Sequence, residues 1–210
     1  MKVHDIKLSK SICDNLLKLI KTDSTIETRV REPGSRKGFI TTEKEYTILE
    51  KYKQHKESGY INYTSKKIEN IIPDYIFEYF NLEKLKCKIE IKEFLPGKLH
   101  IPHKDYYANY SHGLTNESVY NFNENTEIQI NNYFIRIWIS LTEPKFGHVL
   151  IIENKALYWL DQGTIVTWDK NELHSAANLG YENRYIMTIT GKKYVTNRLH
   201  NFFIKKQKYT

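Results

Sequence analysis

Residues Phe94–Asp105 read F-L-P-G-K-L-H-I-P-H-K-D and follow an alternating run, K-I-E-I-K-E-F, that begins at Lys88. The alternation is typical of a half-buried strand, and the Pro-Gly pair after it indicates a turn. Side chains two apart on an extended segment point to the same face. The stretch therefore predicts that the imidazole of His103 and the carboxylate of Asp105 project side by side, as two ligands of one metal ion would.

A third ligand has to come from elsewhere in the chain, and His174, which closes the segment T-W-D-K-N-E-L-H, is the best candidate. Two histidines and one carboxylate on a rigid scaffold form the facial triad that holds non-haem Fe(II) and leaves positions open for other ligands. An H-x-D triplet alone is weak evidence, because most histidines on half-buried strands only satisfy a hydrogen bond. The metal hypothesis therefore depends on the residues around His174.

Arg184 lies ten residues after His174 and opens the apolar run Y-I-M-T-I. If residues 179–183 form a hairpin turn, Asn178 pairs with Arg184, and His174 lies on the same face as both. Four residues of strand then place the guanidinium about 13 Å from the histidine backbone. A five-carbon dicarboxylate that chelates the metal would span this gap, and arginine binds a carboxylate bidentately. The alternative is a surface arginine after a turn.

From Cys87 onward the hydrophobic period is two, which predicts a mainly β core with flanking helices. The predicted strands are 87–95, 133–142, 148–153, 156–160, 163–168, 173–178 and 184–190. Many short, evenly spaced strands favour a jelly roll or a barrel. The polar insert 107–132 directly follows the H-K-D triplet, so we expect a lid over the site, the alternative being a disordered segment.

Residues 1–86 are predicted to be a helical support packed against this core, which spans 87–191. The predicted helices are 9–21, 43–57 and 66–82, the last interrupted at Pro73. The tail 192–210 is basic, and we expect it to form a solvated face. A chain of 210 residues is long enough for one large domain, so 1–210 is predicted to be a single unit.

The formal net charge is +7, with lysines spread along the whole chain. Diffuse charge more often serves solubility than nucleic-acid binding, so nucleic acid is not the expected partner. Cys13 and Cys87 show neither metal-type spacing nor a disulfide framework, which fits a reducing compartment. No apolar run approaches the ~20 residues of a membrane span, and no signal-peptide pattern opens the chain. We expect a cytoplasmic protein that acts on a small molecule or a peptide.

The segment Phe94–Asp105 resembles the first ligand segment of Fe(II)/2-oxoglutarate-dependent oxygenases of the prolyl-hydroxylase kind. Residues 134–190 resemble the aspartyl/asparaginyl β-hydroxylase-like branch, in the order R-x-W-I-x-L-x-x-P, G-H, G-x-x-x-x-W-D, H-x-x-x-N and R. The resemblance covers 87–191, about half the chain. The β-hydroxylase that gives the branch its name lacks the metal carboxylate, whereas this chain keeps Asp105.

The resemblance implies a cupin-like double-stranded β-helix in which His103, Asp105 and His174 hold Fe(II). It also implies that Arg184 binds the C5 carboxylate of 2-oxoglutarate and that Arg136, which opens the R-I-W-I-S-L strand, reaches the same cosubstrate. The implied reaction uses O₂ to hydroxylate a C–H bond, with succinate and CO₂ as co-products. An amino-acid side chain, on a protein or a small molecule, is the expected substrate.

Two other functions remain open at this point. A nucleic-acid demethylase of this superfamily typically has a second arginine six residues after the first, but this chain has Thr190 there. The other alternative is a non-catalytic jelly-roll binding module. Among the remaining polar residues, His100 is expected to face away from His103, since it lies three positions before it. Trp138 is expected in the core, while His148 and His112 are candidates for the entrance.

Overall fold

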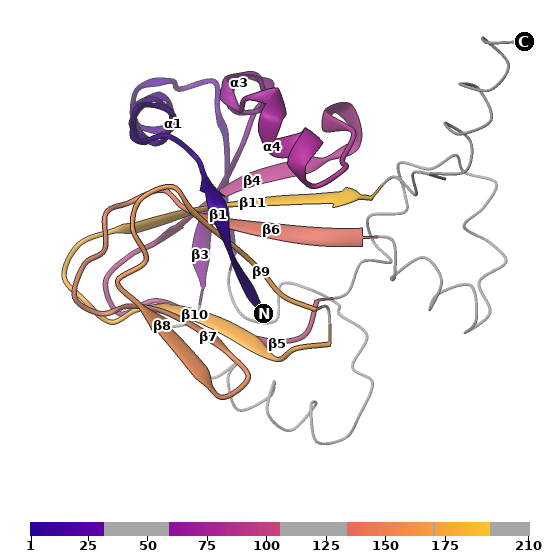
Figure 1. Ribbon diagram of the computed structural model, residues 1–210. Coiled ribbons are helices and arrows are strands. Elements are labelled where there is room, and N and C mark those ends of the chain that lie inside the picture. The colour runs from indigo at the N-terminus through magenta and orange to yellow at the C-terminus, as the bar shows by residue number, and fades with distance from the viewer. Residues whose placement is uncertain (32–58, 106–133, 170, 194–210) are drawn as a thin grey trace, which may run out of the picture.

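The computed structural model describes residues 1–31, 59–105, 134–169 and 171–193 (Figure 1). The strands are β1 (Lys2–Lys7), β2 (Glu27–Arg31), β3 (Tyr60–Thr64), β4 (Lys88–Phe94), β5 (Leu99–His103), β6 (Phe134–Ser140), β7 (His148–Ile152), β8 (Lys155–Tyr158), β9 (Thr164–Thr167), β10 (His174–Asn178) and β11 (Arg184–Lys192). The helices are α1 (Lys10–Thr22), α3 (Lys66–Ile71), α4 (Asp74–Tyr79) and the short 3₁₀ helix η1 (Lys84–Lys86).

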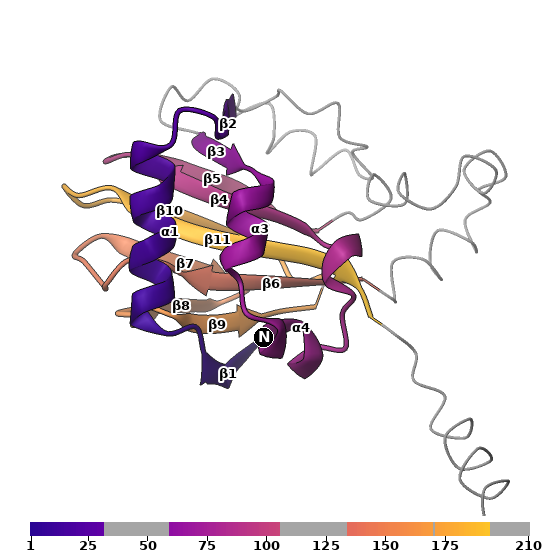
Figure 2. The same cartoon turned by 90° about the horizontal axis from the view of Figure 1, so that it is seen from above.

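The strands form two antiparallel sheets that face each other. The larger has seven strands in the order β1-β9-β6-β11-β4-β3-β2, and the smaller has four in the order β5-β10-β7-β8. Helices α1, α3 and α4 cover the face of the larger sheet that is turned away from the smaller one (Figures 1 and 2). Strands that are distant in the sequence are neighbours in each sheet, which makes the core a double-stranded β-helix, as predicted.

Alternation along the strands divides the apolar core into two layers. In β4, Ile89 and Ile91 point toward the helices, whereas Phe94 points toward the smaller sheet. The helix-side layer includes Leu16, Ile68, Ile72, Ile76, Ile137, Ile139 and Met187, and the layer between the sheets includes Trp138, Leu150, Ile152, Val166, Trp168 and Ile186. Burying a side chain of this size contributes about 1.5–3 kcal/mol. The inner layer forms the walls that carry the candidate site.

The structure matches each of the seven predicted strands within a few residues, and the predicted helices at 9–21 and 66–82 are present. The second is divided at Pro73, which is the N-cap residue of α4. The predicted helix 43–57, the insert 107–132 and nearly all of the tail 192–210 lie outside the described residues. No helix in the described ranges combines the length and apolar character needed to cross a membrane.

Residues 1–86 are more than the helical support that the sequence predicts. They also supply β1, β2 and β3, which lengthen the larger sheet at both of its edges. β2 reads E-T-R-V-R and is mostly exposed, so it lacks the apolar alternation that marks a half-buried strand. β1 pairs with β9, more than 150 residues away, through contacts that no local pattern encodes.

Candidate metal and anion site

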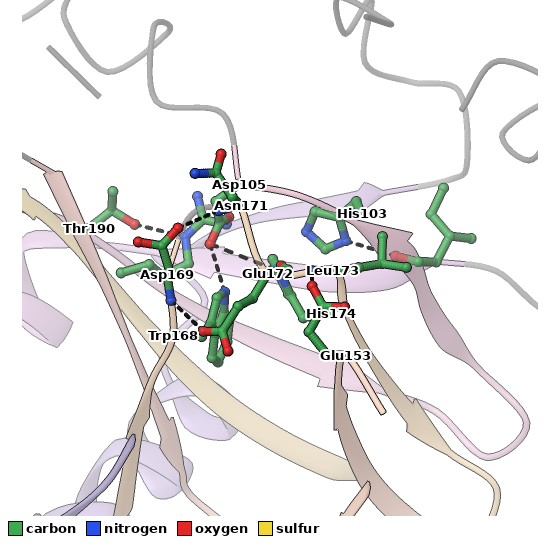
Figure 3. Close-up of polar contacts among 12 residues, drawn as sticks. His103, Asp105, Glu153, Trp168, Asp169, Asn171, Glu172, Leu173, His174 and Thr190 are labelled. Atoms are coloured by element: carbon green, nitrogen blue, oxygen red, sulfur yellow. Dashed lines mark hydrogen bonds and ion pairs between the residues drawn. The ribbon is translucent and has the colours of Figure 1, made fainter. Parts of the chain in front are cut away.

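The antiparallel pairing of β5 with β10 brings the two predicted histidine ligands together. His103 ends β5, His174 begins β10, and the two are direct register partners. Their ring centroids are 4.2 Å apart, and Nε2 of His174 lies 3.8 Å from Oδ2 of Asp105. One potential ligand atom from each of the three residues lies within 4.8 Å of the others. The predicted triad is therefore assembled at one place (Figure 3).

Hydrogen bonds to the backbone determine which imidazole nitrogen is available. Nδ1 of His103 lies 2.7 Å from the Ile101 carbonyl oxygen, and Nδ1 of His174 lies 3.0 Å from that of Glu172. A carbonyl oxygen only accepts, so each Nδ1 carries the proton and donates it. Each Nε2 is left with a lone pair, and that of His103 is buried with no hydrogen-bond partner in the described part of the chain. Histidine ligands of metals are commonly held in this way, so these residues fit a metal ion.

The protonation states of the triad also suit a metal ion. Burial lowers the pKa of His103 well below its ordinary value, and burial lowers the pKa of His174 as well, so both rings are neutral near pH 7. Burial alone raises the pKa of Asp105, but the charge of Arg136, followed by the effects of the two histidines, brings it below the ordinary value. Two neutral imidazoles and one ionised carboxylate form the ligand set that a divalent cation requires.

Both oxygens of Asp105 are held by neighbouring donors. Nη1 of Arg136 is ion-paired with Oδ1, and the indole nitrogen of Trp168 donates to Oδ2 over 3.0 Å. Nε of Arg136 also donates to the hydroxyl of Thr190, which lies directly opposite it on β11, over 3.2 Å. The structure thus places Arg136 beside the carboxylate of the candidate triad.

Arg184 is buried between the two sheets, with 3% of its surface exposed. Its Nη1 donates to the carbonyl oxygens of Val149 and Ala177 at 2.5 and 2.7 Å. Within the described ranges, no carboxylate is ion-paired with its guanidinium. Burial lowers its pKa to about 9, which still leaves it charged at neutral pH. A buried cation without a counter-ion is costly, and an anionic ligand would offset that cost.

The route by which Arg184 comes to lie inside the barrel differs from the predicted one. β11 pairs with β4 and β6 in the larger sheet, whereas β10 pairs with β5 and β7 in the smaller sheet. Residues 179–183 therefore cross from one sheet to the other, and Asn178 and Arg184 are not hairpin partners. The arginine side chain spans the space between the sheets to carbonyls on β7 and β10.

His100 lies against the triad, so the prediction that it faces away is wrong. Its ring centroid is 4.1 Å from that of His103 and 4.9 Å from that of Tyr60. His174 pairs with His103, and Ala176 pairs with His100. The step from one pair to the next is therefore two residues on β10 but three residues on β5. This bulge reverses the alternation and turns His100 to the metal side.

Trp168 contacts the triad, a role that the sequence analysis did not assign to it, whereas His148 lies away from the triad. The indole N–H of Trp168 donates to Asp105, and the Trp168 ring centroid is 4.5 Å from that of His174. In the sequence, only the W-D pair that precedes His174 pointed to a role for this residue. His148 is buried opposite Asn178, at the other end of β10 from His174, and His112 lies outside the described residues. Trp138 is in the inner apolar layer, as predicted.

Comparisons with known proteins identify the fold but no sequence family. No family model and no curated protein matches the chain. The viral collagen prolyl hydroxylase of Paramecium bursaria Chlorella virus-1, solved in complex with 2OG, matches with a TM-score of 0.52 and 13% identity, over 92% of this chain and 95% of that one. A predicted oxalate decarboxylase of Thermotoga maritima also matches, with a TM-score of 0.37 and 12% identity, over 64% of this chain and 81% of that one. A cupin of Salinispora arenicola matches with a TM-score of 0.33 and 12% identity, over 58% of this chain and 72% of that one.

The chain therefore has a double-stranded β-helix fold like that of the viral hydroxylase. This likeness shows the fold alone, since the two sequences are only 13% identical. The activity has to be argued from the residues of the site.

Proposed function

We propose that this protein is an Fe(II)- and 2-oxoglutarate-dependent dioxygenase that hydroxylates a C–H bond. One observation carries the proposal: the same barrel holds a triad of two neutral histidines and one ionised carboxylate, and a buried arginine cation without a carboxylate partner in the described ranges. The first fits a divalent metal, and the second fits the far carboxylate of a dicarboxylate. A ligand that chelates the metal and ends in a second carboxylate joins the two.

The roles of the residues follow from their protonation states. His103 and His174 present Nε2 lone pairs, and Asp105 presents a carboxylate oxygen, so these three side chains hold the metal. Arg184 binds the C5 carboxylate of 2-oxoglutarate and so orients its oxo-acid end toward the triad. When bound, Fe(II) with O₂ and 2-oxoglutarate supplies the oxidising chemistry, with succinate and CO₂ as co-products.

Arg136 lies at the metal end of the proposed site. Its guanidinium keeps Asp105 ionised and, together with Trp168, fixes the orientation of the carboxylate. Contact of Arg136 with the cosubstrate stays a prediction; its position beside Asp105 favours the C1 carboxylate end, which is opposite the end that Arg184 binds.

The proposed substrate class is an amino-acid side chain, carried by a peptide or by a small molecule. The viral neighbour is named a collagen prolyl hydroxylase, which makes prolyl peptides the first members of a substrate panel. Both cysteines are free, and this supports the proposed cytoplasmic location.

Succinate formation tests the proposal. We expect the Fe(II)-loaded protein to convert 2-oxoglutarate to succinate when a panel of prolyl, asparaginyl and aspartyl peptides and free amino acids is supplied, and His174→Ala to form none. Absence of turnover across the panel, in protein shown to bind Fe(II), would favour a non-catalytic binding module instead.

A further inference from the structure

Trp138, on β6, carries a buried polar atom that the fold does not use. The residue is 2% exposed, and its indole nitrogen has no hydrogen-bond partner among the described residues. The indole N–H is a donor only. A buried donor without an acceptor destabilises the folded protein, so such a donor in a native core is uncommon and calls for an explanation.

The indole ring that carries this donor lies against the guanidinium of Arg184. Cζ of Arg184 is 5.3 Å from the centroid of the Trp138 ring. Two carbonyl oxygens accept hydrogen bonds from Nη1 of Arg184, but neither supplies the negative charge that the guanidinium lacks. In the register of β6 with β11, Trp138 is opposite Thr188, between Arg136, which is opposite Thr190, and the end of β11 that begins with Arg184. A guanidinium without a counter-ion in the described ranges and an indole N–H without an acceptor there thus share one region of the interior.

We infer that Trp138 is a specificity-determining residue whose indole N–H binds, together with Arg184, the far carboxylate of a dicarboxylate ligand. This inference rests on the proposed function and assigns a second residue to its cosubstrate. A neutral donor adds a hydrogen bond without adding a second buried charge. A 2-oxo acid without the far carboxylate leaves the indole N–H without an acceptor and the guanidinium without a counter-ion, and a site of this kind rejects such an analogue strongly.

The competing explanation is that Trp138 only fills the core. Its ring does belong to the inner apolar layer with Phe94, Val166 and Ile186. Phenylalanine keeps an aromatic ring at the position and removes the N–H, so Trp138→Phe separates the two roles. Trp159, which is 64% exposed, provides the matched control variant Trp159→Phe.

The test is an anaerobic equilibrium titration of the Fe(II)-loaded protein with 2-oxoglutarate and, separately, with 2-oxobutyrate, which chelates a metal in the same way but lacks the far carboxylate. We expect Trp138→Phe to weaken 2-oxoglutarate binding about tenfold and to leave 2-oxobutyrate binding unchanged. Trp159→Phe should change neither. Equal weakening of both ligands, or no weakening, would overturn the assignment of Trp138. Failure of the wild-type protein to bind 2-oxoglutarate would instead overturn the proposed function.

A second measurement does not depend on the folding of Trp138→Phe. The chain has three tryptophans, so a ¹⁵N-labelled, Zn(II)-loaded protein gives few indole N–H signals, and Trp159→Phe and Trp168→Phe assign the third by elimination. We expect the Trp138 signal to move downfield when 2-oxoglutarate is added and to stay in place with 2-oxobutyrate. A Trp138 indole N–H signal that does not shift at saturating 2-oxoglutarate would overturn the inference.

Discussion

Arg136 and Asp105 form a buried ion pair, with side chains 6% and 1% exposed, beside the two histidines of the triad. The pair explains how a carboxylate in the interior stays ionised, because burial alone raises the pKa of Asp105 and Arg136 is the main opposing charge. The proposed metal site therefore depends on a residue that does not itself offer a metal ligand.

Replacing Arg136 should make metal binding more sensitive to acid. Arg136→Met raises the pKa of Asp105, so protons compete with the metal at a higher pH than in the wild type. We expect the ratio of Co(II) affinities at about pH 7.5 and about pH 5.5 to be several-fold larger in Arg136→Met. Arg29→Met, which removes an exposed arginine of β2, is the control. An unchanged ratio would show that Arg136 does not keep Asp105 ionised.

Arg184 should provide most of the stabilisation that 2-oxoglutarate gives the metal-loaded protein. A ligand at 100 times its dissociation constant adds about 2.7 kcal/mol to the free energy of unfolding, which raises the melting temperature of a protein of this size by roughly 5–10 °C. In Arg184→Met the shift caused by 2-oxoglutarate should disappear while the shift caused by the metal alone remains. Differential scanning calorimetry measures both. A full 2-oxoglutarate shift in Arg184→Met would rule out this residue as the carboxylate-binding group.

His100 should support the first histidine ligand through ring packing. Its ring lies against that of His103, and aromatic contacts of this kind contribute about 0.5–1.5 kcal/mol. His100→Ala should weaken Zn(II) binding about threefold to tenfold, as measured by competition with a chromophoric chelator, whereas His100→Phe should retain most of the affinity. Equal affinities in His100→Ala and the wild type would contradict a positioning role.

The metal-free protein should lose stability on acidification. The pKa values of His103 and His174 are lowered in the folded state, so the unfolded chain binds more protons as the pH falls below about 6.5. The stability that these neutral rings contribute is present above that pH and is lost as the pH falls toward their folded-state pKa values.

Urea denaturation from about pH 7.5 to about pH 5 should show a shallower decline in the free energy of unfolding in His103→Gln than in the wild type. Saturation of the wild type with Zn(II) should also change this dependence, because the metal competes with protons. Identical slopes in the wild type and His103→Gln would contradict the buried neutral state of His103.

Local sequence pattern predicted the parts of the site that depend on short-range spacing. His103 and Asp105 are two apart on an extended segment, and the strands around His174 alternate clearly, so the triad was recognisable. Arg184 does lie between the sheets, but it reaches that place by a crossing from one sheet to the other and not through the predicted hairpin. That crossing is a property of strand order, which no local pattern reveals.

The residues that the sequence did not reveal are those placed by irregular or distant contacts. A bulge in β5 turns His100 to the metal side, and strict alternation predicts the opposite. Trp168 reaches Asp105 across 63 positions of the chain. The edge strand β2 is largely exposed and polar, so nothing in its composition distinguishes it from a loop.

The most direct test of the central claim is an anaerobic titration of the protein with Fe(II) and 2-oxoglutarate, followed through the weak visible charge-transfer band of the chelate. Wild type, His174→Ala and Arg184→Ala are compared under the same conditions. We predict a band in the wild type that is lost in His174→Ala and appears only at higher 2-oxoglutarate concentration in Arg184→Ala. Absence of the band in wild-type protein that has bound Fe(II) would contradict the assignment of this site to 2-oxoglutarate.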